Sequence, residues 1–173
     1  MSWIMVDVEA DGPIPGDYSM IEIGAVLIDV ATQDLSQRFS ANLRPISDKY
    51  VPEALAISGY TREQTLTFGD PQQVISDFAD WIERKSPQRP MFMSDNNGFD
   101  WMFTCWYFHH FIGKNPFGHS STNLGSFFKG VERDFSKSFK GFRKTRHSHK
   151  AVDDALGNAE AFLKIISTFG VKA

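Results

Sequence analysis

The chain has 173 residues, of which 42% are hydrophobic and 14% aromatic, and its formal net charge is −3. This length and apolar content suffice for one core, so we expect a single domain over residues 1–173. No apolar run approaches the roughly 20 residues of a membrane span, and the N-terminus lacks the basic flank and small-residue cleavage site of a signal peptide. Cys105 is the only cysteine, which excludes an intramolecular disulfide and a multi-cysteine zinc site. We therefore expect a cytoplasmic protein without membrane contact.

The first half of the chain predicts strands followed by helices. Residues 3–8 and 21–30 are β-branched and apolar, and the turn-rich stretch DGPIPGDYS separates them. A third strand over residues 36–43 would complete a meander. Helices are predicted over residues 52–57 and 71–84, and Asp70 ahead of Pro71 is suited to cap the second of them.

The second half begins with a short buried strand, PMFMS at residues 90–94, followed by an aromatic helix over residues 99–112. Apolar residues then repeat at helical spacing from Val152 to Ile166, so the chain closes with an amphipathic helix. Strands first and helices later indicate a mixed sheet with helices packed on it.

A basic segment spans residues 129–150, with eight Lys or Arg side chains against two acidic ones. Phe135, Phe139 and Phe142 are interleaved with these charges. Such a segment could follow a phosphate backbone while its rings contact bases. A solvated loop with three anchoring aromatics explains the pattern equally well.

Asp7 and Glu9 lie two residues apart on the first predicted strand, so they share one face at a backbone separation of roughly 7 Å. Two carboxylates so placed repel each other by roughly 2 kcal/mol at an intermediate dielectric. A hard divalent cation such as Mg²⁺ or Mn²⁺ would offset that repulsion. Such a pair alone is commonly a solvated strand edge, so a metal site requires that further carboxylates converge on it.

Further carboxylates occur where two later helices begin. Asp100 follows the strand at residues 90–94 and the turn-like stretch DNNG. A capping role for Asp95, or a helix-dipole role for Asp100, explains these two acids equally well. The last helix begins within HSHKAVDDA, residues 147–155, which offers two histidines and two aspartates. Helical phase does not choose between Asp153 and Asp154.

The order and spacing of three motifs resemble the DEDDh branch of the 3'–5' exonucleases, which includes oligoribonuclease, ribonuclease T and proofreading subunits of polymerases. VDVEADG at residues 6–12 resembles the first motif, Asp-x-Glu. NNGFD at residues 96–100 resembles the second, and HKAVDD at residues 149–154 resembles the third, His-x-Ala-x-x-Asp. The stretches at residues 21–29 and 54–61 are also similar to segments of that family.

This resemblance implies an α/β, ribonuclease-H-like fold with a five-stranded mixed sheet flanked by helices. It also implies two bound divalent metal ions, Mg²⁺ or Mn²⁺, and His149 as the general base. The carboxylates that it assigns to the metals and to catalysis are Asp7, Glu9, Asp100 and Asp154. One position departs from the family pattern, because the second motif often begins His-Asn and here Asp95 precedes Asn96.

The predicted reaction is metal-dependent hydrolysis of single-stranded nucleic acid from its 3' end. Divalent ions would neutralise the phosphodiester charge, and His149 would take a proton from the attacking water, releasing nucleoside 5'-monophosphates. RNA or short oligonucleotides are favoured as substrates. The alternatives are a DNA-trimming 3'–5' exodeoxyribonuclease of the same family and a non-catalytic nucleic-acid-binding protein on the same fold. A protein without turnover has no use for mutually repelling carboxylates, which argues against the second alternative.

Substrate contacts are expected near the motifs. By the family's habit, the backbone after Glu9 would approach the terminal sugar, the ring of Phe99 would lie near the site, and the basic side chains would meet phosphate. These expected contacts are Ala10, Asp11, Gly12, Asn96, Phe99, Arg146 and His147. Gly12 also fits a turn ahead of Pro13, and Phe99 also fits the core. The surplus of aromatics over residues 99–112 leaves room for base stacking or for a homodimer interface.

Overall fold

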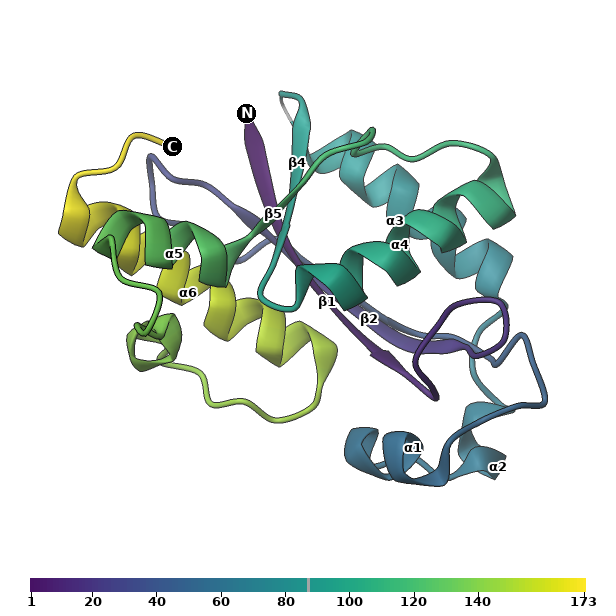
Figure 1. Ribbon diagram of the computed structural model, residues 1–173. Helices are drawn as coiled ribbons and strands as arrows, with labels where there is room; N and C mark the ends of the chain where they lie inside the picture. Colours follow the sequence, from purple (N-terminus) through teal and green to yellow (C-terminus); the bar gives the residue numbers. More distant parts are fainter. Residues whose placement is uncertain (87) are drawn as a thin grey trace.

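The computed structural model describes residues 1–86 and 88–173 (Figure 1). Its five strands form one mixed sheet in the order β3-β2-β1-β4-β5. The first three strands form an antiparallel meander, and the last two run parallel to β1. The strands are β1 (Ser2–Ala10), β2 (Met20–Ile28), β3 (Arg38–Asn42), β4 (Pro90–Ser94) and β5 (Ser121–Asn123). The expected five-stranded mixed sheet is confirmed.

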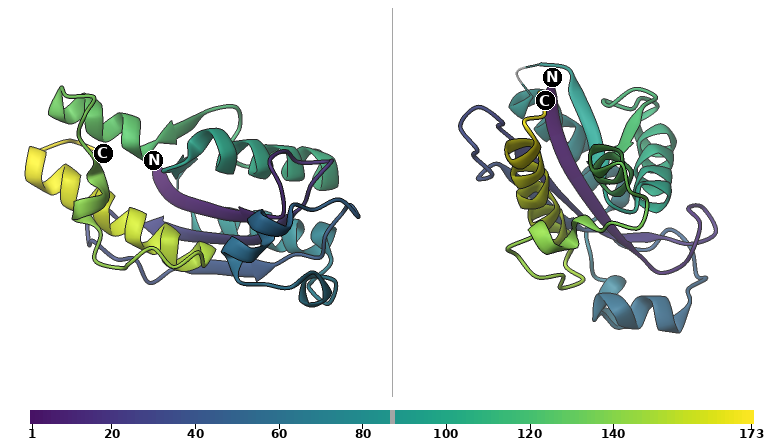
Figure 2. Two further views of the ribbon diagram at one scale, coloured as in Figure 1. Left: turned by 60° about the horizontal axis from the view of Figure 1, so that its bottom comes forward. Right: turned by 60° about the vertical axis from the view of Figure 1, so that its left-hand side comes forward.

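Helices cover both faces of the sheet, and Figure 2 shows α4 and α6 on opposite sides of β1. Among the described residues, no helix is both long enough and apolar enough to cross a membrane. The helices are α1 (Pro52–Ser58), α2 (Arg62–Thr65), α3 (Pro71–Lys85), α4 (Asn97–Ile112), α5 (Leu124–Glu132), the 3-10 helix η1 (Phe139–Phe142) and α6 (Ala151–Phe169).

Two cores lie on opposite faces of β1, because successive side chains of a strand point to opposite sides. Ile4, Val6 and Val8 pack with α3 and α4. Met5 instead packs with α5 and α6. The same alternation places Asp7 and Glu9 on the Met5 side, near the end of β1.

Most predicted elements appear close to their expected bounds. β4 coincides with residues 90–94, and Asp70 caps α3 by accepting a hydrogen bond from the Gln73 amide at 3.1 Å. The predictions missed α2, β5 and α5. α2 has four residues, and β5 is a polar Ser-Thr-Asn segment whose only regular pairing is with β4. Strands of three polar residues carry no hydrophobic alternation, so only tertiary pairing reveals them.

The basic segment is not a single solvated loop, because it contains the end of α5 and all of η1. Phe139 is buried in the second core, and Phe142 is half-buried against Phe128, with ring centroids 5.4 Å apart. Phe135, by contrast, is 88% exposed. Two of the three aromatics therefore anchor the segment, and the third does not.

Helix α6 meets β2 without intervening side chains. A methyl group built on Gly24 would overlap with backbone atoms of Ala151 and Val152. The absence of a side chain at Gly24 thus lets the first turn of α6 rest directly on the strand. This contact positions the turn that carries Asp154.

Candidate active site

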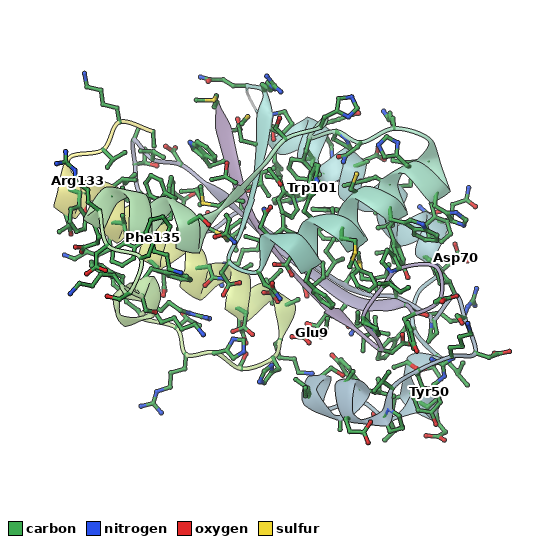
Figure 3. The ribbon with its side chains drawn as sticks, in the orientation of Figure 1. Glu9, Tyr50, Asp70, Trp101, Arg133 and Phe135 are labelled. Carbon is green, nitrogen blue, oxygen red and sulfur yellow. The ribbon has the colours of Figure 1, made fainter. Side chains whose placement is uncertain are left out.

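A cavity of about 880 Å³ opens where β1 and β4 end. Because these two strands are parallel, their carboxyl ends lie at the same edge of the sheet. Glu9 lies near the end of β1, between α6 and α1 (Figure 3). The cavity is lined by Asp7, Val8, Glu9, Ala10, Gly12, Pro13, Val51, Ala54, Ile57, Asp95, Asn96, Phe99, Asp100, Phe139, Lys140 and His147.

The structure brings together the four carboxylates of the three motifs. Asp7 is 9% exposed, Asp100 2% and Asp154 1%, while Glu9 is half-buried. One oxygen from each of Asp7, Glu9 and Asp154 lies within 4.8 Å of the others. Burying several carboxylates together is costly unless a positive group compensates them.

The donor set fits divalent cations. Asp7 also belongs to a second compact group of carboxylates. In this group, one oxygen from each of Asp7, Asp95 and Asp100 lies within 4.8 Å of the other two. Asp100 Oδ1 accepts a long hydrogen bond from the Val8 amide at 3.4 Å, and Asp100 Oδ2 has no hydrogen-bond partner within the described part of the chain. A buried carboxylate oxygen without a donor has the chemistry of a ligand for a hard cation.

Crowding of these acids changes their protonation. Burial, followed by the charges of Asp100 and Glu9, raises the pKa of Asp7 well above its usual value. Burial and then the charge of Asp95 raise the pKa of Asp100 likewise. For Glu9, burial and the charges of Glu22 and Asp154 raise the pKa to about 7. Without a cation, the cluster therefore retains protons close to neutral pH.

Glu22 is a buried carboxylate that sequence reasoning missed. It lies opposite Glu9 in the β1–β2 pair and accepts hydrogen bonds from Tyr60 Oη at 3.0 Å and from the Ala151 amide at 2.9 Å. The second bond satisfies a free amide at the start of α6. The sequence signal for Glu22 was a charged residue inside an otherwise apolar strand. Such a residue needs polar partners when it is buried.

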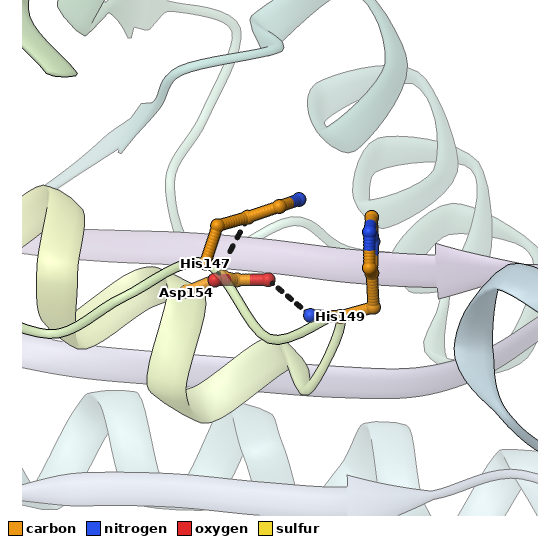
Figure 4. Close-up of side chains that lie close together, drawn as sticks. All are labelled: His147, His149 and Asp154. Carbon is orange, nitrogen blue, oxygen red and sulfur yellow. Dashed lines mark hydrogen bonds and ion pairs between the residues drawn. The ribbon is translucent and has the colours of Figure 1, made fainter.

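Asp154 of the third motif lies beside both His147 and His149 (Figure 4). Its Oδ1 accepts hydrogen bonds from Arg143 Nη2 at 2.8 Å and from the Ser148 amide at 3.1 Å, and lies 2.9 Å from His147 Nδ1. Its Oδ2 accepts one from the His149 amide at 2.9 Å. Within the described residues, the Asp153 carboxylate accepts a single hydrogen bond, from Ser148 Oγ at 3.5 Å. The geometry thus distinguishes two aspartates that helical phase could not.

Arg143 forms a buried ion pair with Asp154, and its side chain is 8% exposed. A methyl group at position 157 would clash with the Arg143 guanidinium, so Gly157 provides its space on α6. The sequence did not single out Arg143 among the eight cations of its segment. The signal that could have found it is the glycine on a helix that must pack against that segment.

The two histidines lie beside Asp154 in different ways. His149 has a left-handed backbone, with φ of 56°, just ahead of α6. The two imidazole centroids are 4.2 Å apart. His147, and not His149, lines the cavity. The structure therefore brings both rings to the third motif and places the ring of His147 nearer to the open space.

The expected substrate contacts fall into two groups. Ala10, Gly12, Asn96, Phe99 and His147 line the cavity. The ring of Phe99 also packs on Phe103, with centroids 4.8 Å apart. Gly12 lies so close to the Tyr18 ring that a Cβ would overlap with it, so close packing is one reason for a glycine there.

Asp11 is the one expected contact that lines neither this cavity nor its neighbour, within the described part of the chain. Its fully buried carboxylate accepts hydrogen bonds from Arg62 Nη1 at 2.9 Å and from the Ser19 amide at 2.6 Å. Its backbone amide donates to Ser19 and its carbonyl accepts from the Val51 amide. With all of these groups engaged inside the protein, Asp11 supports the turn and does not face a ligand.

Arg146 lines a second cavity, of about 270 Å³, that borders the first. The two cavities share Asp95, Lys140 and His147. Asp95 does not cap α4, since its Oδ1 accepts a hydrogen bond only from the adjacent Asn96 amide, at 2.9 Å. It lies instead between the acidic and basic parts of the site.

We expect the metal-free protein to lose stability as the pH rises. The pKa of Glu9 is about 7 in the folded chain, against the usual 4.5, so the unfolded chain releases its proton first. Stability should therefore fall between about pH 4.5 and pH 7 and stay low above it, with Asp7 and Asp100 acting in the same direction. Thermal unfolding in EDTA at several pH values measures this. Glu9→Gln should flatten the profile, and an equal slope in that variant would contradict the assignment.

Comparison with known proteins agrees with this geometry. The RNase T exonuclease family model matches residues 4–162. The 3'-5' DNA exonuclease Cap18 of Escherichia coli is 35% identical over 176 aligned positions, which cover 92% of this chain and 89% of Cap18.

Solved structures show the same fold. The nuclease domain of 3'hExo, a DEDDh family member bound to rAMP, superposes with a TM-score of 0.79 at 17% identity, over 96% of this chain and 92% of that one. Escherichia coli exonuclease I in complex with a dT13 oligonucleotide gives a TM-score of 0.72 at 16% identity, over 96% of this chain and 41% of that one. Together with the family match and the convergence of the motifs, these similarities show that the chain belongs to the DEDDh branch of the 3'–5' exonuclease superfamily.

Proposed function

We propose that the protein is a metal-dependent 3'–5' exonuclease that shortens single-stranded nucleic acid and releases nucleoside 5'-monophosphates. The observation that carries this proposal is the convergence of four carboxylates: Asp7, Glu9 and Asp100 line one cavity, and an oxygen of the buried Asp154 lies within 4.8 Å of oxygens of Asp7 and Glu9. Two divalent ions held by these carboxylates would neutralise the charge of a phosphodiester and of the oxygen that leaves it. Each of the four acids would bind the ions, and Asp7, which belongs to both compact groups of carboxylates, would contribute to holding each ion.

His149 is the proposed general base, because it holds the histidine position of the third motif. Its amide is fixed by Asp154, and its left-handed backbone determines where its side chain leaves the loop. A histidine there would take a proton from the attacking water near neutral pH. His147, whose Nδ1 lies beside Asp154, would contact phosphate.

A non-catalytic binding protein on this fold is the competing class. Such a protein would retain the basic segment, but it would gain nothing from burying carboxylates that repel one another. Burial and mutual repulsion raise the pKa values of Asp7, Glu9 and Asp100, so keeping these carboxylates charged costs free energy. The acidic cluster therefore favours an enzyme.

DNA is proposed as a substrate alongside RNA. The relative with 35% identity is named as a DNA exonuclease, which weighs against the preference for RNA expected from the sequence alone. The exonuclease I structure contains a single-stranded dT13 oligonucleotide. Ala10, Gly12, Asn96 and Phe99 line the part of the cavity where a terminal nucleotide would lie.

The second cavity is proposed to take phosphates upstream of the terminal nucleotide. It is lined by Lys140, Lys144 and Arg146, and it continues from the catalytic cavity through Lys140 and His147. Cations along such a groove position a strand through its phosphates without reading its sequence.

The central test uses 5'-labelled single-stranded RNA, single-stranded DNA and duplexes, each with Mg²⁺, Mn²⁺ or EDTA. We expect a ladder that shortens from the 3' end of the single strands only when metal is present. Asp7→Asn should produce no ladder, because Asp7 belongs to both carboxylate groups. Tight binding of these substrates without any product, under every metal condition, would instead show that the protein is a non-catalytic nucleic-acid-binding protein.

The third motif offers a test with internal controls. We expect His149→Ala and Asp154→Ala to lower kcat by about 10²-fold to 10⁴-fold, the usual contribution of a general base or more. His147→Ala and Asp153→Ala should be much milder. Single-turnover rates at saturating metal would measure the difference. Equal losses from His147→Ala and His149→Ala would show that the assigned register is wrong.

The upstream groove predicts a dependence on substrate length. Replacing Lys144 and Arg146 by Ala should raise KM for long oligonucleotides and leave dinucleotides almost unaffected. The slope of log affinity against log salt should fall by about one for each lost phosphate contact. Lys137→Ala removes an exposed cation of the same segment outside both cavities, and serves as the matched control. An equal rise in KM for dinucleotides and long oligonucleotides would contradict the proposal that the second cavity binds upstream phosphates.

A further inference from the structure

Asp95 is the first residue after β4 and the one position where the second motif departs from the family pattern. Its side chain lines the catalytic cavity together with Asp7 and Asp100. One oxygen from each of these three carboxylates lies within 4.8 Å of the other two. A cation at their centre would therefore reach all three.

The loop that carries Asp95 is held in place by β5. Asn123 Nδ2 donates a hydrogen bond to the Asp95 carbonyl at 2.7 Å. Two residues later, Asn97 donates to the Thr122 carbonyl at 3.1 Å and accepts from Ser121 Oγ at 2.8 Å. These bonds tie the Asp95 carbonyl and the Asn97 side chain to β5, so the turn that presents the Asp95 carboxylate to the cavity is anchored there.

No protein cation compensates this group. Within residues 1–86 and 88–173, none of Asp7, Asp95 and Asp100 has a Lys, Arg or His nitrogen within ion-pair distance, although Asp154 has Arg143. Asp100 is 2% exposed and lines the cavity, and its Oδ2 has no hydrogen-bond partner in the same part of the chain. Three carboxylates at this separation repel one another, and a cation bound among them would relieve that repulsion without the carboxylates having to retain protons.

We propose that Asp95 is a fifth metal-binding carboxylate, which holds a divalent cation together with Asp7 and Asp100. The other ion of the proposed function would be held by Asp7, Glu9 and Asp154. This inference rests on that function and adds a ligand that the family motifs do not contain. Because affinity for hard cations rises with the number of charged oxygen ligands, the ion at Asp95 binds firmly even without substrate.

Manganese titration of the substrate-free full-length chain tests the proposal, by calorimetry and by the electron paramagnetic resonance of free Mn²⁺. The unaltered protein should bind two ions. Asp95→Asn and Asp95→Ala should weaken one of them by about tenfold or more, since each removes a charged ligand, and leave the other unchanged. Asp7→Asn should weaken both.

Asp153→Asn is the matched control, because it removes one negative charge next to Asp154 in the chain but lies outside both compact carboxylate groups. Thermal unfolding of each variant in EDTA establishes that it is folded. Unchanged affinities in both Asp95 variants would overturn the proposal and leave the exonuclease intact. Equal weakening by Asp153→Asn would also overturn it, since a general loss of charge would then explain the effect. Absence of any Mn²⁺ binding by the unaltered protein would contradict the proposed function itself.

Discussion

Repulsion among buried carboxylates is the constraint on which this structure depends. Asp7, Asp100 and Asp154 are almost fully buried. Glu9 lies two residues after Asp7 on β1, and Glu22 faces Glu9 from β2. Folding energy from two apolar cores offsets that repulsion, because each core packs one face of β1 and holds the strand in register. The cluster is therefore a place where stability is sacrificed for chemistry, as strained groups at functional sites commonly are.

The two sides of the site compensate their charge differently. On the α6 side, the Asp154 carboxylate accepts hydrogen bonds from Arg143 and from two backbone amides, and His147 Nδ1 lies beside it. These contacts set its orientation without an ion. On the α4 side, Asp100 has one long hydrogen bond and an oxygen without a donor. The first side is preorganised by protein groups. The second has fewer protein partners, so its carboxylates are the less constrained of the two sets.

Much of this site could be predicted from the sequence, because strand alternation and motif order are local properties. The shared face of Asp7 and Glu9, the strand at residues 90–94 and the final helix all followed from periodicity. The contacts of Glu22 and Arg143 were not predicted, although each left a signal in the sequence, because their partners lie on other elements that a local pattern does not place beside them. The same holds for Asp11, whose carboxylate is bonded to Arg62 and Ser19 and lines neither cavity. The choice of Asp154 over Asp153 came from motif register, and helical phase alone left it open.

The contact between Gly24 and the first turn of α6 bears on how this protein can change. Since backbone meets backbone there, the placement of this turn on β2 depends on main-chain geometry and not on the shapes of side chains. Gly157 is a second constraint on α6, because a side chain there would clash with the Arg143 guanidinium that pairs with Asp154. Substitutions at the other positions of the second core can alter stability while these two contacts hold Asp154 in place. The position of one carboxylate thus depends on two glycines from distant parts of the chain.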